Sequence, residues 1–190
     1  IFLHKYGVDT VIDFRTKQEQ LMAPDKKIPE ANYFVLPVFK EDETQSTITP
    51  TDLYAKILAG ESGQKKMEDA YTDFVLTTQA QKTYQMFFEH LITEEKTLIF
   101  HCTAGKDRTG FGAYLFLSAL GIPEEVIYED YLLTNPASEE KVDHMLKEAR
   151  KQNAPEELVK NILDLLLAKK SYLDTAVDAI EKNYGNVEGF

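Results

Sequence analysis

The residues best suited to chemistry lie in one ten-residue stretch, HCTAGKDRTG, which runs from His101 to Gly110. A β-rich apolar run, TLIFHC, leads into this stretch, and an apolar helix-forming segment follows it. Small residues between a strand and a helix let successive backbone N–H groups converge on one anion, with the positive end of the helix dipole behind them. We therefore expect the backbone of residues 103–108 to form an oxyanion cradle, in which Gly105 provides close backbone approach or a positive φ.

Cys102 lies at the base of the expected cradle. The groups that bind an anion there also stabilise a thiolate, which is the nucleophilic form of cysteine. Arg108 can direct two N–H donors at two phosphate oxygens, a geometry that lysine cannot match, and the Thr109 hydroxyl can donate to the thiolate. The alternative is that Cys102 is an inert buried residue, a common role of free cysteine. That alternative requires the flanking His, the Gly and the Arg-Thr pair to coincide by chance.

The pattern HC-x5-R-T resembles the signature loop of the cysteine-dependent protein tyrosine phosphatases, and HCTAGKDRTG is similar to a bacterial tyrosine/serine, lipid-phosphatase-like branch. IDFR at Ile12–Arg15 resembles the family's DLR strand end, EDYLLTN at Glu129–Asn135 the helix after the catalytic helix, and YGNVEGF its C-terminal segment. The resemblance implies hydrolysis of phosphotyrosine monoesters through a phosphocysteine, extending to phosphoserine, phosphothreonine and phosphoinositides. It also implies one phosphatase domain over residues 1–190, lacking the family's N-terminal segment and last residues.

The resemblance further assigns roles within the loop. Asp107 is the preferred acid for protonating the leaving group, as the aspartate of AGKDR is thought to be in this branch. Its rivals are Glu41 and Asp42, which follow an expected strand and could also be a solvated acidic loop. Lys106 is expected at the mouth of the loop, where its charge would permit phosphoinositide binding. The full expected site comprises catalytic Cys102, Arg108 and Asp107, phosphate-binding Thr103, Ala104, Gly105, Lys106 and Arg108, and supporting His101 and Thr109.

Two residues near the loop have open roles. His101 either orients the loop and tunes Cys102 or is purely structural. Arg15 follows a strand whose carboxyl end should face the cradle, where ligands of α/β proteins usually bind. It can contact substrate there or pair with Asp13 or a loop carboxylate, and we favour the pairing.

Three other functions fit parts of the pattern. A rhodanese-like sulfurtransferase also uses a cysteine loop after a parallel strand, but its loop is usually shorter and lacks HC…GKDRT. A non-catalytic phosphate-binding module is disfavoured because Cys102 and Arg108 are both present. Inositol-polyphosphate hydrolysis uses the same chemistry, and the acidic composition disfavours the basic pocket that it needs.

The composition excludes several other classes. The formal net charge is −11 at pH 7, which argues against nucleic-acid partners and against attraction to an anionic membrane surface. The longest stretch without a charged residue, Thr109–Pro123, is shorter than the roughly 20 residues of a membrane-spanning helix. One cysteine and no HxH or HExxH spacing predict no metal site and no cofactor. No signal peptide is visible, which favours the cytoplasm over secretion, although the chain opens at Ile1; the oligomeric state is left open.

The surrounding pattern predicts an α/β fold in which helices flank a central, mostly parallel sheet, with a helical C-terminal half. Three apolar runs predict strands buried on both faces, at residues 8–14, 32–38 and 97–102. Helices are expected around residues 84–91, 109–120, 124–135, 142–149, 158–166 and 172–180. Gly121 is expected to end the second of these in a left-handed conformation. Residues 41–49 and 59–66 are polar and aperiodic, and are expected to form loops near the site.

Overall fold

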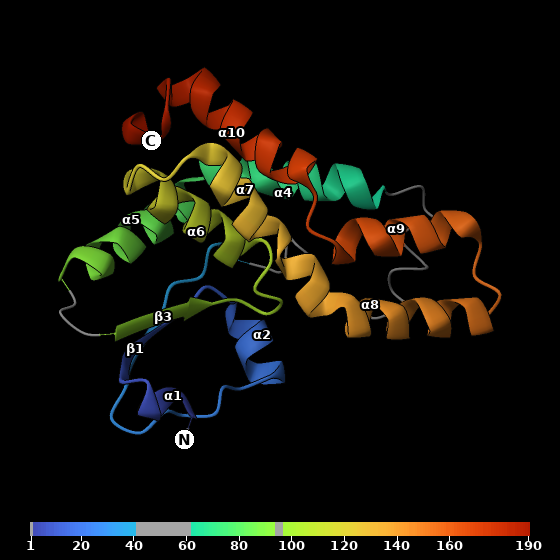
Figure 1. The fold of residues 1–190 in the computed structure, drawn as a ribbon, viewed down its shortest axis with the longest axis horizontal. Coiled ribbons are helices and arrows are strands. Elements are labelled where there is room, and N and C mark those ends of the chain that lie inside the picture. Colours follow the sequence, from blue (N-terminus) through green and yellow to red (C-terminus); the bar gives the residue numbers. More distant parts are fainter. Residues whose placement is uncertain (1, 41–61, 94–96) are drawn as a thin grey trace.

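Three parallel strands form the sheet in the computed structural model, which describes residues 2–40, 62–93 and 97–190. They are β1 (Val8–Asp13), β2 (Asn32–Val35) and β3 (Thr97–His101), in the order β2-β1-β3. Asp13 pairs with Val35 on one side and with His101 on the other. The strands therefore end together, and the segments that follow β1 and β3 meet at the same edge of the sheet (Figure 1).

The strands differ in burial. β1 is the central strand, and all but one of its residues are buried. The prediction that all three strands are buried on both faces is wrong for β2 and β3, whose residues are partly buried or exposed. Both lie at the edges of the described sheet, so each has a neighbouring strand on one side only.

Four described helices precede β3: α1 (Phe2–Lys5), α2 (Lys17–Met22), α4 (Gly63–Leu76) and α5 (Thr78–Thr93). The prediction of a loop at residues 59–66 is wrong for residues 63–66. The Ser62 hydroxyl caps α4 by accepting from the backbone N–H of Lys65, so residues 63–66 form the first turn of a helix. The predicted loop at 41–49 lies outside the described residues.

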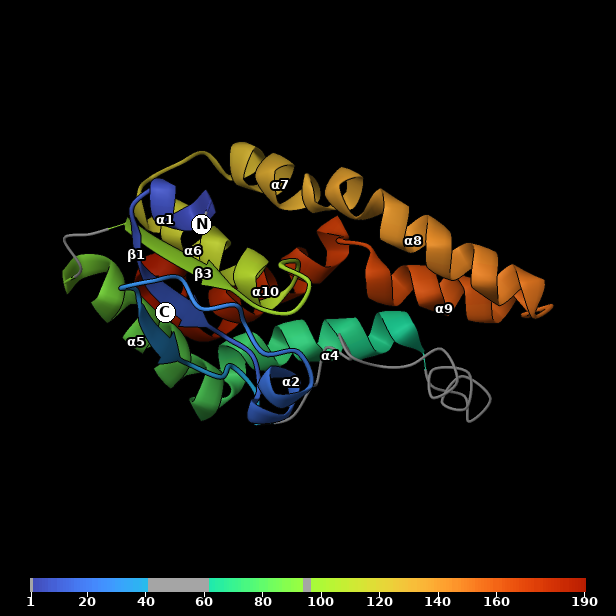
Figure 2. The same cartoon turned by 90° about the horizontal axis from the view of Figure 1, so that it is seen from below.

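The C-terminal half is helical, as predicted. It contains α6 (Arg108–Ala119), α7 (Glu124–Leu132), α8 (Thr134–Lys151), α9 (Glu156–Leu166), α10 (Lys170–Tyr184) and the short 3₁₀ helix η1 (Val187–Gly189). Gly121 follows α6 with φ +73°, the left-handed conformation expected from the sequence. Both views show α8 and α9 side by side, extending away from the sheet (Figures 1 and 2). None of the described helices combines the length and apolar character needed to cross a membrane.

An aromatic cluster joins the sheet to α5 and α6. Phe14, the residue after β1, is fully buried and makes ring contacts with Tyr84 and Phe87 of α5 and with Phe100 of β3. Such contacts contribute about 0.5–1.5 kcal/mol each beyond the area that they bury. They fix the start of α6 against the sheet, since Tyr84 also donates a hydrogen bond to the Arg108 carbonyl at 3.0 Å.

Candidate functional site

The loop from Cys102 to Asp107 joins the end of β3 to the first residue of α6. Cys102 is 7% exposed, whereas the next three residues, 103–105, are exposed and 106–108 are buried again. The thiol therefore lies beneath an open rim of small residues. Gly105 has φ +73°, and a Cβ built there would meet no atom within 4 Å. Glycine is therefore required at position 105 by the left-handed backbone rather than by a close approach of other protein atoms.

Arg108 is fully buried at the start of α6, and its guanidinium is held by Glu19 of α2. Nη1 and Nη2 donate to the two carboxylate oxygens of Glu19, each at 2.7 Å. This bidentate arrangement uses two of the five N–H donors of the guanidinium and fixes its plane. Burial by itself would raise the pKa of Glu19, but the hydrogen bonds and positive charge of Arg108 lower it to about 2.

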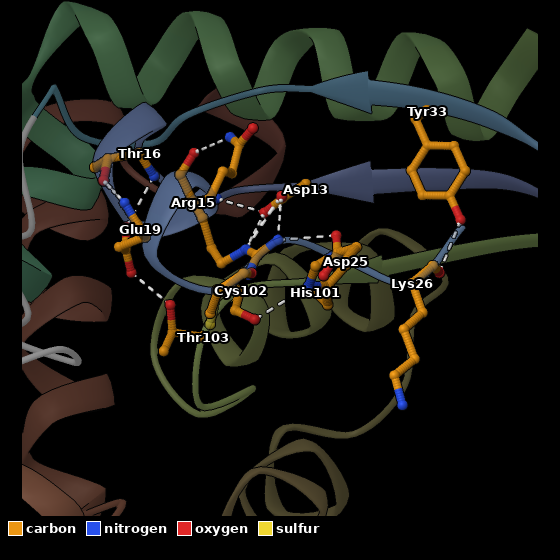
Figure 3. Close-up of polar contacts among 12 residues, drawn as sticks. Asp13, Arg15, Thr16, Glu19, Asp25, Lys26, Tyr33, His101, Cys102 and Thr103 are labelled. Carbon is orange, nitrogen blue, oxygen red and sulfur yellow. Dashed lines mark hydrogen bonds and ion pairs between the residues drawn. The ribbon is translucent and has the colours of Figure 1, made fainter. Parts of the chain in front are cut away.

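Glu19 also links the loop to the end of β1. It accepts a hydrogen bond from the Thr103 hydroxyl at 2.5 Å and another from the backbone N–H of Thr16 at 2.8 Å. The Thr16 hydroxyl accepts from the Glu19 N–H in return, which completes a capping box at the start of α2. Figure 3 shows Glu19 between Thr16 and Thr103. Glu19 is absent from the sequence prediction, although the T-x-x-E spacing directly after the DFR strand end is a recognisable capping signal.

The Glu19–Arg108 pair predicts a specific acid sensitivity. The folded pKa of Glu19, about 2, lies below its ordinary value of 4.5. Its stabilising effect is therefore complete above pH 4.5 and is lost as the pH falls toward 2. The difference corresponds to about 3 kcal/mol. In urea unfolding at successive pH values, the stability gap between wild type and Glu19→Gln should shrink across that interval. The matched control is Glu139→Gln, which removes an exposed carboxylate on α8; a gap that stays constant with pH would contradict the prediction.

Asp107 and Lys106 are buried, unlike the exposed residues 103–105 of the same loop. Asp107 is 3% exposed, and its Oδ1 lies 3.0 Å from the Tyr71 hydroxyl and 3.1 Å from the Lys106 ammonium. Lys106 also donates to the Leu165 carbonyl at 2.9 Å, at the end of α9. The expected positive charge at the open mouth is therefore not found. The ammonium is buried because carbonyl oxygens near the C-terminus of a helix are favourable partners for a cation.

His101 and Arg15 belong to an ion-pair network beside Cys102 (Figure 3). Arg15 pairs with Asp13 and with Asp25, each at 2.8 Å, so the structural pairing favoured from the sequence is the arrangement found. His101 Nδ1 lies 3.1 Å from the Cys102 carbonyl oxygen, and Nε2 lies 3.2 Å from Asp25. His101 thus links the backbone of Cys102 to this network. Asp13, Asp25 and His101 also have the spacing of metal ligands, but the Arg15 guanidinium already contacts both carboxylates.

The remaining predicted residues are placed as follows. The Thr109 hydroxyl is buried and has no hydrogen-bond partner within the described part of the chain. The hydrogen bond from Thr109 to Cys102 that the sequence predicts is therefore not found among the described residues. Glu41 and Asp42, the rival acids, lie outside the described residues.

The fold and the loop together define a class of protein. A cysteine lies at the carboxyl end of a parallel strand, an open loop of small residues follows it, and a buried arginine begins the next helix. Such an arrangement is suited to a tetrahedral oxyanion. A family model described as the tyrosine phosphatase family matches residues 1–190. The chain belongs to this family, so the resemblance inferred from the loop is confirmed at the level of the family.

Curated relatives agree with this assignment. A Cupriavidus necator protein, provisionally named a tyrosine-protein phosphatase, is 29% identical over 199 residues, covering 99% of this chain and 66% of the relative. The triple specificity protein phosphatase PtpB of Mycobacterium tuberculosis is 26% identical, covering 99% and 77%. A tyrosine-protein phosphatase of Nostoc commune is 26% identical, covering 80% and 51%. The chain thus spans about half to three quarters of the length of these relatives.

Proposed function

We propose that the chain is a cysteine-dependent phosphatase that hydrolyses phosphotyrosine monoesters through a phosphocysteine on Cys102. The observation that carries the proposal is the juxtaposition of a buried thiol and a buried, oriented guanidinium across one loop. Cys102 and Arg108 lie on either side of the exposed residues 103–105. A nucleophile, a row of backbone donors and a clamp for phosphate oxygens are the parts that phosphoryl transfer to cysteine needs.

The reaction proceeds in two displacements. The Cys102 thiolate attacks phosphorus as the P–O bond to the tyrosine oxygen breaks, and Asp107 gives its proton to the departing phenolate. Water then attacks the phosphorus of the phosphocysteine, and Asp107 takes up a proton from this water. The P–S bond breaks, which releases inorganic phosphate and restores the thiolate. Arg108 and the backbone N–H groups of the loop bind the equatorial phosphate oxygens, and the Thr109 hydroxyl donates to the thiolate as it leaves.

The substrate class follows from the loop and from the relatives. Phosphorylated proteins or peptides are the proposed partners, with phosphotyrosine first and phosphoserine, phosphothreonine and phosphoinositide head groups as further substrates. A relative named for triple specificity supports a range wider than phosphotyrosine alone. The position of Lys106 makes inositol polyphosphates less favoured substrates than phosphotyrosine, because the Lys106 ammonium is bonded to the Leu165 carbonyl and to Asp107. A second phosphate on the substrate would therefore not find the Lys106 ammonium at the rim.

Turnover of a substrate panel tests this function. Purified chain is expected to release phosphate from a phosphotyrosine peptide faster than from a phosphoserine peptide or from phosphoinositide in vesicles, and orthovanadate, a phosphate analogue, is expected to inhibit it. Preferred turnover of the phosphoinositide would instead make the lipid the main substrate. Binding of vanadate without hydrolysis of any substrate would overturn the enzyme assignment in favour of a phosphate-binding module.

A further inference from the structure

Two buried tyrosines from distant helices converge on Asp107. Tyr71 lies on α4 and is fully buried, and Tyr131 lies on α7 and is 4% exposed. Their hydroxyl oxygens are 2.7 Å apart, and the Tyr71 hydroxyl lies 3.0 Å from Asp107 Oδ1. Neither tyrosine is close to the loop in sequence, and neither has a role in the reaction described above.

The hydrogen bonds have one consistent direction. A tyrosine hydroxyl has a single proton, and the Asp107 carboxylate oxygen can only accept, so Tyr71 donates to Asp107. The bond between the two tyrosines must then run from the Tyr131 hydroxyl to the Tyr71 oxygen. Successive donors in such a chain polarise one another in a buried site. Burial, reinforced by the charge of Asp107, raises the pKa of both hydroxyls, so both remain protonated donors at working pH.

The surroundings hold this chain rigidly. The Tyr71 ring contacts Phe74 at 4.8 Å and Tyr172 at 5.9 Å between centroids. The Tyr131 ring lies directly on the first turn of α6, where a Cβ on Gly110 would come within 3.0–3.1 Å of it. Gly110 therefore leaves the space that Tyr131 fills. The donor chain reaches the loop as part of the core rather than as a mobile surface contact.

The contacts also distinguish the two oxygens of Asp107. Among the described residues, both contacts to this carboxyl, from Tyr71 and from Lys106, fall on Oδ1. A proton on Oδ1 would make this oxygen a weaker acceptor for both contacts, which favours Oδ2 as the oxygen that holds the proton of a protonated Asp107. We propose that Tyr71, supported by Tyr131, is a positioning residue that fixes the Asp107 carboxyl and assigns Oδ2 as the proton-donating oxygen. The inference rests on the proposed function, in which Asp107 protonates the leaving phenolate.

A comparison of two leaving groups tests the proposal. Phenyl phosphate releases a basic phenolate that needs a proton, whereas p-nitrophenyl phosphate releases a stable phenolate that needs little help. Tyr71→Phe removes the hydroxyl and keeps the ring. We expect kcat/KM for phenyl phosphate to fall about tenfold, because a positioned acid contributes ~10²–10⁴-fold and the substitution removes only part of that contribution. We expect kcat/KM for p-nitrophenyl phosphate to change less than about threefold. Tyr131→Phe should shift the same ratio in the same direction by a smaller factor.

The controls separate this proposal from the one on which it rests. Tyr172→Phe removes a buried hydroxyl that donates to the Asp164 carbonyl, so it should leave the ratio of the two substrates unchanged. Asp107→Asn should shift the ratio more than Tyr71→Phe does. The double variant with both substitutions should show the same ratio as Asp107→Asn alone. If Asp107→Asn leaves the ratio unchanged, the acid assignment fails and the positioning role fails with it. If Asp107→Asn shifts the ratio but the Tyr71→Phe and Tyr131→Phe variants are folded and leave it unchanged, only the positioning role is overturned.

Discussion

Cys102→Ser is expected to abolish turnover of phosphotyrosine substrates, with a loss of at least about 10⁴-fold in kcat, as removal of an enzyme nucleophile generally gives. The substitution exchanges one atom and keeps the loop, Arg108 and the backbone donors. A serine hydroxyl is not ionised at neutral pH even in an anion cradle, so the nucleophilic thiolate has no replacement. Affinity for orthovanadate or a phosphotyrosine peptide should persist, because the groups that bind phosphate remain. Steady-state kinetics together with calorimetric titration measure both quantities.

The sequence allows the covalent intermediate to be assigned to a single residue. Cys102 is the single cysteine of the 190 residues, so covalent phosphate attached to sulfur can arise at one position. Acid quenching during turnover, followed by mass spectrometry, should find phosphate on Cys102 in wild type and none in Cys102→Ser. Residual turnover by Cys102→Ser at a tenth of the wild-type rate would rule out the covalent mechanism, whatever its binding affinity.

Glu19→Gln is expected to lose about 10²-fold in kcat/KM, the scale that a misplacement of about 1 Å in a binding clamp can cause. The carboxylate that holds both terminal nitrogens of Arg108 becomes an amide, which can accept from only one of them. A buried guanidinium that loses its charged partner is also left poorly compensated. The arginine should then turn away from the phosphate position. Kinetics with p-nitrophenyl phosphate and the inhibition constant for orthovanadate measure the effect.

Two further variants interpret this result. Glu139→Gln, which removes an exposed carboxylate on α8, should behave as wild type and controls for the change in net charge. Arg108→Lys retains the positive charge but loses the planar fork, and it should lose at least as much activity as Glu19→Gln. If folded Glu19→Gln keeps wild-type kcat/KM and wild-type affinity for vanadate, then Glu19 serves only to cap α2, and Arg108 is oriented by other contacts.

Local patterns were sufficient for the elements around the loop. The apolar runs at residues 8–14 and 97–102 predicted the two strands that end beside the site, and the uncharged segment from Thr109 predicted α6. These predictions succeeded because strand and helix periodicity are properties of consecutive residues. No helix is predicted from the sequence at residues 63–76, where α4 supplies Tyr71, because the polar residues 63–66 carry little periodicity. The buried face of α4, with Met67, Tyr71 and Phe74, nevertheless follows a helical spacing.

What the sequence by itself determined is the chemistry of the loop: a cysteine, a turn glycine and an arginine at fixed spacing, in a chain of the tyrosine phosphatase family. What only the tertiary structure decided is which distant groups act on that loop. Glu19 reaches Arg108 across 89 positions of the sequence, and Tyr71 reaches Asp107 across 36. Lys106 turned out to be bonded within the core instead of presented at the rim. These contacts depend on parallel strands ending at one edge and on helices packing over it, and no pattern of neighbouring residues encodes which side chains such packing brings within hydrogen-bonding distance.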